Sequence, residues 1–340
     1  MISAVGLTAK ETATSVRSTT MRFTEASFLD HRFEPFTVAE IPADGLPQLD
    51  DAVEKDGLTS REARLLRIGT AALVECVESV PVGATPLALM LSLPELQTTE
   101  PLEPMSFLRR FEQQSRVAID LSASQATHTG RAGGLIAIGK AIQTIAKAQA
   151  DFVVAGGIDS YLDPYILGTL DLNQRINSTA NLDGFIPGEA AAFLLLANAA
   201  KAESAGLTPV AFISAVAEGF EVGHIESEEP YRGEGLAAVF QKLTEAGAAP
   251  AISDVYSSMN GESHWAKEWG VAFLRTSSAF APEHGMHHPA DCLGDLGAAC
   301  GPLMAGLAAL GIRDGYRGSP TLVYGSSDKG ARAALILRAA

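Results

Sequence analysis

Two stretches of the sequence gather residue types that do chemistry in proteins. The first runs from His284 to Cys292 and places His288 and Asp291 close to the cysteine. Such side chains bind metals, and a thiol beside a histidine can act as a nucleophile with its base. The spacing matches no standard zinc pattern, so we expect neither a metal nor a cofactor. A role of Cys292 as a nucleophile remains an alternative, and an ordinary loop is the simplest interpretation.

The second stretch is an apolar segment from Gly130 to Gly157. Apolar residues surround its first part on nearly every face, which predicts a buried helix, and its end from Phe152 predicts a buried strand. The small residues of the first helical turn leave N–H groups and the positive end of the helix dipole facing outward. An enzyme would place an anion or an activated nucleophile there. Here the position holds Arg131, and a buried arginine needs a partner.

Alternating strands and helices are predicted to position these residues. Strands are predicted at 86–91, 117–121, 152–155, 190–197, 210–217, 252–257, 271–275, 321–327 and 334–337. Helices are predicted at 59–80, 107–114, 163–172, 199–205, 233–246, 265–268 and 294–310. Before residue 50 we expect the end of a strand at 2–7, a loop at 35–47, and little regular structure otherwise.

One order of elements occurs twice along the chain. A buried helix of small residues, an apolar strand ending in glycine, a turn and a second apolar strand occupy 130–197 and again 294–338. This pattern predicts an internal duplication, with an N-terminal half of residues 1–205 and a C-terminal half of residues 206–340. Two buried helices between sheets predict five layers, α/β/α/β/α.

The composition describes a compact α/β protein with ample core. The chain has 340 residues, 47% of them hydrophobic and 19% charged, with a formal net charge of −15. This charge argues against nucleic acid or an anionic membrane as partner, because both need clustered cations. Three cysteines imply no disulfide framework. With no leader pattern and no apolar run of about 18 residues, we expect a cytoplasmic protein.

Several strings resemble segments of the β-ketoacyl-acyl carrier protein synthases, which have the thiolase-like fold. Asp151-Phe-Val-Val-Ala-Gly-Gly and Asp183-Gly-Phe-Ile-Pro-Gly-Glu-Ala-Ala are the best matches, and Leu296-Gly-Ala-Ala is another. Gly325-Ser-Ser-Asp-Lys-Gly stands where that family has its closing glycine-rich loop, so Gly325, Ser326 and Ser327 are expected beside the pocket. The resemblance covers most of the chain and implies a thiolase-like five-layer fold with two pseudo-duplicated halves.

The resemblance also implies that the family's catalytic residues are replaced. The nucleophilic cysteine at the start of the first buried helix corresponds to Arg131, and the first histidine corresponds to Asn260. The second histidine falls on Gly294, the lysine on or near Pro289, and the gating phenylalanine on Ser326. Without a thiolate and paired imidazoles, neither an acyl-enzyme nor the decarboxylation enolate is stabilised. We therefore expect no ordinary decarboxylative condensation.

The thiolase-like fold brings the N-termini of the two buried helices together. Asp295 lies in the first turn of the second helix, at the favourable end of its dipole, and Glu262 and Asp291 are further acidic candidates. We predict that Arg131 pairs with Asp295 or Glu262 and fills the former catalytic pocket. An anion-binding role for Arg131 is the alternative.

The leading hypothesis is a ketosynthase-like protein of a fatty-acid or polyketide type of acyl pathway, altered or inactive in the manner of a chain-length factor. It is expected to form a homodimer or to pair with an active ketosynthase. Arg61, Arg64 and Arg67 stand three apart on one helix. They are either a solvated face or, as in the family, a docking site for the acidic acyl carrier protein.

Two other functions remain open from the sequence. The first is an acyl transferase or thioesterase that uses Glu262, His288, Asp291 and Asp295 as a non-standard catalytic set. The second is a scaffold protein that uses only the fold and its dimer surface.

Overall fold

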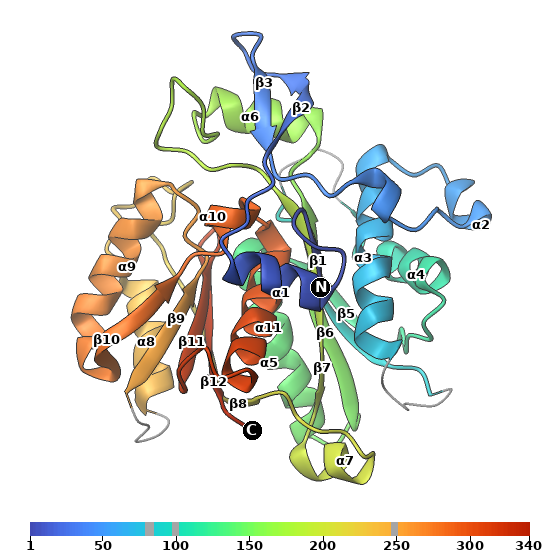
Figure 1. Cartoon of the computed structure of the whole chain (residues 1–340), viewed down its shortest axis with the longest axis vertical. Coiled ribbons are helices and arrows are strands. Elements are labelled where there is room, and N and C mark those ends of the chain that lie inside the picture. Colours follow the sequence, from blue (N-terminus) through green and yellow to red (C-terminus); the bar gives the residue numbers. More distant parts are fainter. Residues whose placement is uncertain (79–84, 97–101, 246–250) are drawn as a thin grey trace.

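Two five-stranded sheets dominate the computed structural model, which describes residues 1–78, 85–96, 102–245 and 251–340 (Figure 1). The first sheet has the order β1-β7-β6-β4-β5, and the second has the order β10-β9-β11-β12-β8. The strands of the first sheet are β1 (Ile2–Ser3), β4 (Ala88–Leu93), β5 (Gln125–His128), β6 (Phe152–Ser160) and β7 (Glu189–Ala197). Those of the second are β8 (Phe212–Phe220), β9 (Ile252–Ser257), β10 (Phe280–His287), β11 (Thr321–Ser326) and β12 (Ala331–Arg338). A separate hairpin pairs β2 (Thr24–Leu29) with β3 (Pro35–Val38).

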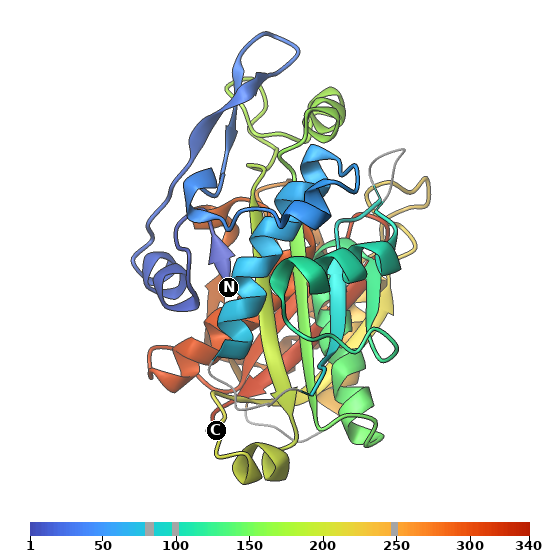
Figure 2. The ribbon, with the colours of Figure 1, turned by 90° about the vertical axis from the view of Figure 1, so that its right-hand side faces the viewer.

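Helices form the other three layers (Figures 1 and 2). Between the sheets lie α5 (Gly133–Ala146) and α11 (Cys300–Arg313), each preceded by a single 3₁₀ turn, η2 (Gly130–Ala132) and η4 (Gly297–Ala299). The first sheet is covered by α3 (Ser60–Glu78) and α4 (Pro104–Ser115), and the second by α8 (Glu234–Glu245) and α9 (Ser263–Thr276). The remaining helices are α1 (Ala9–Arg17), α2 (Asp51–Glu54), α6 (Pro164–Leu172), α7 (Ala199–Ser204) and α10 (Ala290–Leu293). The predicted five layers are confirmed.

The central layer explains why the apolar segments are so continuous. Strand β4 is buried on both faces, since α3 packs on one side of its sheet and α5 on the other. A strand buried on both faces has no polar side, and its sequence loses the alternation of a surface strand. For the same reason α11 is almost wholly apolar. Because α5 and α11 are buried between the sheets, the turns that precede them also lie inside the protein, where they form the site described below.

The internal duplication is visible in the topology. In each sheet the first strand in sequence pairs with the last, and the last runs antiparallel to the strand before it. Gly130 and Gly297 open the equivalent turns η2 and η4 with positive φ angles of 64° and 48°, where a side chain would be strained. The chain therefore enters both central helices in the same way.

Three sequence predictions are wrong in this part of the chain. The segment 271–275 belongs to α9, because residues at helical spacing (Trp265, Glu268, Ala272 and Thr276) are buried along one face. A short apolar run does not by itself distinguish helix from strand. The segment 117–121 forms only an isolated bridge at Ile119, and the strand begins at Gln125. The predicted loop at 35–47 contains β3, and the N-terminal region also holds α1 and β2.

The stretch His284–Cys292, interpreted as a loop, instead holds the end of β10 and most of α10. The remaining element predictions agree to within a few residues. The predicted helix ends at Val80 and Ala246 lie outside the described residues. Helix α4 begins at Pro104, before the predicted start at residue 107, since Glu103 caps it through the N–H groups of Met105 and Ser106. No helix within the described ranges is both long and apolar enough to cross a membrane.

Candidate functional site

The site lies where η2 and η4 meet between the two sheets. Strand β11 comes so close to η2 that a Cβ on Gly325 would lie 2.7 Å from the carbonyl oxygen of Arg131. Beyond that glycine, the Ser327 hydroxyl accepts a hydrogen bond of 2.9 Å from the Ala132 N–H and donates one to the carbonyl of Thr129. The segment Gly325–Ser327, at the end of β11, therefore lines the start of α5.

Arg131 is buried and paired with two carboxylates of its own chain. Its Nε donates to Asp295 Oδ2 at 2.7 Å, and its Nη1 donates to Asp328 Oδ1 at 2.6 Å. Burial opposes the guanidinium charge, but Asp295 and Asp328 outweigh it and raise the pKa of Arg131 well above its ordinary value. The predicted pairing with Asp295 is confirmed, and Asp328 is an additional partner.

A second arginine extends this pair into a network. Arg175, on the loop after α6, donates to both oxygens of Glu262 at 2.7 and 2.8 Å and to Asp328 Oδ2 at 2.6 Å. The Asn260 amide donates to Glu262 at 3.0 Å and to Asp295 at 2.7 Å. Burial favours the protonated form of Asp328, but Arg131 and Arg175 together hold its pKa well below the usual range.

This arrangement fills the space in front of α5. Three carboxylates face two arginines, and N–H donors offset the extra negative charge: besides Asn260, Gly297 donates to Asp295 and Trp265 donates to Glu262. The Trp265 ring lies 5.0 Å from the Arg131 guanidinium carbon and 5.6 Å from that of the buried Arg332. The geometry supports an internal ion network over an anion site, because Arg131 is 2% exposed and pairs with two carboxylates of its own chain. Its Nη2 lies 2.6 Å from Asp295 Oδ2 but forms no well-aligned hydrogen bond.

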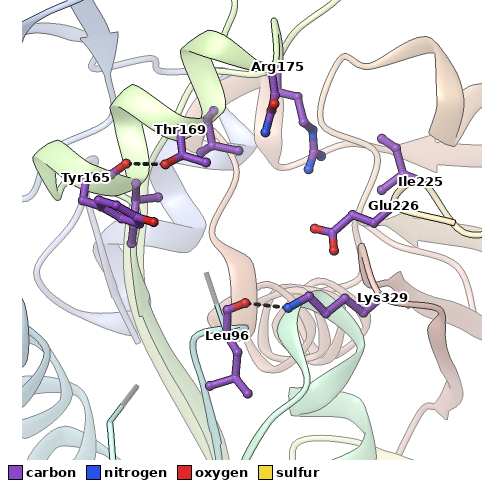
Figure 3. Close-up of a pocket in the computed structure, with 10 residues that line it drawn as sticks. Leu96, Tyr165, Thr169, Arg175, Ile225, Glu226 and Lys329 are labelled. Carbon is purple, nitrogen blue, oxygen red and sulfur yellow. Dashed lines mark hydrogen bonds between the residues drawn. The ribbon is translucent and has the colours of Figure 1, made fainter. Parts of the chain in front are cut away.

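An open pocket of about 590 Å³ lies outside the network. Helix α6 forms one wall with Tyr165, Ile166, Thr169 and Leu170, and Asn173 follows at its C-terminal end. Leu96, Ile225, Glu226 and Lys329 complete the lining, and Arg175 links the pocket to the buried charges (Figure 3). The pocket therefore reaches the network at Arg175.

The structure does not bring the other predicted catalytic residues to this site. His288 shares a 2.7 Å hydrogen bond with the Ser257 hydroxyl, and Asp291 is exposed on α10. Burial raises the pKa of the Cys292 thiol, which is the opposite of what a nucleophile needs. Cys300, at the start of α11, lies within electrostatic reach of Asp295, and burial raises its thiol pKa still further.

The three arginines of the predicted basic stripe on α3 are half-buried and bind groups of their own chain. Arg61 donates to the Ser160 carbonyl, and Arg67 donates to carbonyl oxygens of the segment 43–47. Arg64 donates to both carboxylate oxygens of the fully buried Glu189. The stripe is neither a solvated face nor a free cationic surface.

Sequence reasoning missed Arg175, Asp328 and Trp265 as members of the network. Asp328 carried a usable signal, because it is a charged residue inside a glycine- and serine-rich loop that the resemblance placed at the pocket. Arg175 carried none, since it stands in a polar loop far from the other members in sequence. Its neighbour Gln174 turns the chain inward with a φ angle of 53°.

One surface group in the described residues has metal-ligand geometry. Ligand atoms of Asp30, His31 and Asp171 lie within 4.8 Å of one another. The Asp30 carboxylate already accepts hydrogen bonds from Arg32 and from the Glu34 N–H, and His31 bonds to Asp171. These internal contacts account for the cluster, and we assign no metal to it.

Comparisons with known proteins agree with this architecture. The model of the beta-ketoacyl synthase N-terminal domain matches residues 117–202. The actinorhodin polyketide beta-ketoacyl synthase 2 of Streptomyces coelicolor is 32% identical over 148 residues, which cover 39% of this chain and 34% of that protein. The match thus spans about a third of the relative's length.

Solved structures match over the whole chain. The ishigamide ketosynthase/chain length factor gives a TM-score of 0.79 at 14% identity and covers 100% of this chain and 97% of that one. A type II PKS acyl-carrier protein in complex with its ketosynthase bound to the hexaketide gives 0.76 at 16% identity, covering 100% and 97%. The fold is therefore the thiolase-like fold of the ketosynthases. Around α5, residues 117–202 also resemble the beta-ketoacyl synthase N-terminal domain in sequence.

Proposed function

We propose that this chain is a ketosynthase-like subunit of a polyketide or fatty-acid type of acyl pathway that does not itself carry out decarboxylative condensation. It keeps the fold and has an ion network where the chemistry would take place. In this respect it would act like a chain-length factor, shaping or supporting the work of an active partner.

One observation carries the proposal. At the start of α5, where the helix dipole would activate a thiolate, Arg131 is locked between Asp295 and Asp328. A thioester approaching this position meets a guanidinium and two carboxylates and finds no nucleophile among them. Asn260, at the position aligned with a catalytic histidine, uses its amide to stabilise Glu262 and Asp295. The charged side chains at this site therefore bind one another.

The partner we propose is a ketosynthase subunit, in a cytoplasmic dimer. The ishigamide ketosynthase/chain length factor and a ketosynthase in complex with an acyl-carrier protein are among the structures that share this fold. A homodimer is the second possibility. Because Arg61, Arg64 and Arg67 are engaged within the chain, we assign no carrier contact to α3. We also propose that the chain divides into two halves at residue 205, because each half supplies its own sheet.

The two alternative functions receive less support. An acyl transferase or thioesterase would need Glu262, His288, Asp291 and Asp295 to act together, yet His288 is bonded to Ser257 and Asp291 is exposed. Glu262 and Asp295 are tied to arginines. A scaffold role has no particular residue in its favour.

Reconstitution tests the proposal. The tagged chain is purified from its own host, its partners are identified by mass spectrometry, and the complex is rebuilt from purified components. We expect a ketosynthase that carries a cysteine nucleophile, and we expect its product lengths to change when this chain is present. A partner unrelated to acyl chains would favour the scaffold. Turnover of acyl thioesters by the chain alone would overturn the noncatalytic assignment.

A further inference from the structure

One wall of the pocket is held by a pair of contacts between two loops. The main-chain N–H of Lys329, in the β11–β12 turn, donates to Glu95 Oε1 at 3.1 Å. The Lys329 ammonium donates to the carbonyl of Leu96 at 2.6 Å, as Figure 3 shows. Both Leu96 and Lys329 line the pocket. Glu95 and Lys329 therefore join the loop after β4 to the turn that carries Asp328.

The carboxyl group of Glu95 is tightly surrounded. Its other oxygen, Oε2, would lie 2.5 Å from a Cβ on Gly130, so it fits against η2 only because that residue is glycine. Within the described residues, Glu95 forms no ion pair. The guanidinium of Arg131 attracts the Glu95 carboxylate, but it is already bound to Asp295 and Asp328. The Lys329 ammonium donates its hydrogen bond to the Leu96 carbonyl and not to Glu95.

Other charged and titratable groups face Glu95 from each neighbouring element. Asp328 in the β11–β12 turn and Glu226 in the loop after β8 repel a negative charge on Glu95, whereas Arg131 in η2 attracts it. His128, at the end of β5, bonds through its ring to the carbonyls of Pro94 and Leu102. A carboxylate at Glu95 is thus partly buried and faces two acids, and no cation in the described part of the chain forms an ion pair with it.

We propose that Glu95 is a proton-operated clasp, which holds the Leu96–Lys329 wall of the pocket closed when protonated and releases it when ionised. In the closed state the neutral carboxyl accepts the Lys329 N–H without repelling Asp328. When the proton leaves to solvent, the carboxylate gains hydration by moving outward, and the wall opens. The inference concerns access to the pocket and does not depend on the proposed function.

The size of the effect follows from linkage between proton binding and opening. Burial, with the neighbouring Asp328 charge, raises the pKa of Glu95 from 4.5 to about 7 in the closed state. In an open, hydrated state the pKa returns toward 4.5, so the closed state binds the proton more tightly and loses it as pH rises. Between pH 6 and pH 8 the opening equilibrium should increase about tenfold.

Hydrogen exchange of the Lys329 amide tests the clasp, because this N–H is the donor to Glu95. Exchange is followed by mass spectrometry on a peptide covering residues 325–331 and corrected for the intrinsic pH dependence. We expect the protection of the wild-type amide to fall about tenfold from pH 6 to pH 8. Glu95→Gln, which keeps an acceptor oxygen without a charge, should remove this fall. Glu25→Gln, on the exposed β2, should leave it unchanged.

Two further variants keep the test decisive if Glu95→Gln folds poorly. Lys329→Met loses the bond to Leu96 and should open more at both pH values, while the tenfold ratio persists. His128→Gln should keep the ratio as well. Wild-type protection that does not change between pH 6 and pH 8 would overturn the clasp. A ratio that survives in Glu95→Gln and disappears in His128→Gln would assign the switch to the histidine and overturn it equally.

Discussion

Removing the Arg131 guanidinium should destabilise the fold substantially. In Arg131→Met, Asp295 and Asp328 lose bonds of 2.7 and 2.6 Å in a site where all three side chains are at most 2% exposed. Removing one partner of a buried ion pair costs about 3–5 kcal/mol, because the remaining charge stays buried. Arg175 still holds Asp328 and Asn260 still holds Asp295, so we expect the lower end, about 3 kcal/mol.

Urea unfolding, followed by circular dichroism and tryptophan fluorescence, measures this loss, provided that the two transitions coincide. The loss should be nearly independent of salt, since buried charges are little screened. Arg131 holds the pKa of Asp328 below its ordinary 3.8, so its contribution is present above about pH 4 and shrinks as the pH falls further. The difference between wild type and variant should shrink in the same way.

A second substitution separates charge from packing. In Arg131→Met with Asp328→Asn, the combined loss should be smaller than the sum of the single losses by about 0.5–3 kcal/mol. Lys201→Met is the control, because its ion pair with Asp151 is about half exposed and should contribute at most about 1 kcal/mol. A loss below about 1 kcal/mol for Arg131→Met, or one that high salt abolishes, would refute the buried network.

Three further predictions follow from the same structure. Arg64→Met should lower the free energy of unfolding by about 3–5 kcal/mol, because it leaves Glu189 buried without its cation; a loss of carrier binding at unchanged stability would instead revive the docking interpretation. Arg131→Cys should form no acyl adduct by mass spectrometry, since a thiolate there would face two carboxylates; an adduct would show that the replaced residue alone silences the site. Iodoacetamide should label the thiols slowly at pH 7.5 and rapidly in urea, because burial raises the pKa of Cys76, Cys292 and Cys300; equal rates would contradict this.

The central layers could be predicted from the sequence because their burial dominates the pattern. A helix buried on nearly all sides and a strand buried on both faces have no polar side, so the first half of α5, α11 and β6 stand out from the surface elements. The duplication could be predicted because the same order of elements occurs twice in the sequence. The pairing of Arg131 with Asp295 followed from two facts, namely that a buried cation needs an anion and that the two helix starts converge.

Other features depend on contacts that a single sequence does not encode locally. The segment 271–275 is short and apolar, and in the folded chain Ala272 and Trp269 pack in the apolar cluster of the second sheet. The three arginines of α3 have the spacing of a surface stripe, yet Glu189, 125 residues away from Arg64, draws one of them inward. Arg175 reaches its two carboxylates across 87 and 153 residues. Such distant partners become visible only when the chain is folded.

The most direct test of the central claim is the mass of the protein after exposure to acetyl- and malonyl-carrier proteins, together with the carbon dioxide released. The ion network around Arg131 predicts an unmodified mass and no release of carbon dioxide above a carrier-only control. A covalent acyl adduct on any side chain would contradict it. So would condensation at a rate that Arg131→Ala abolishes.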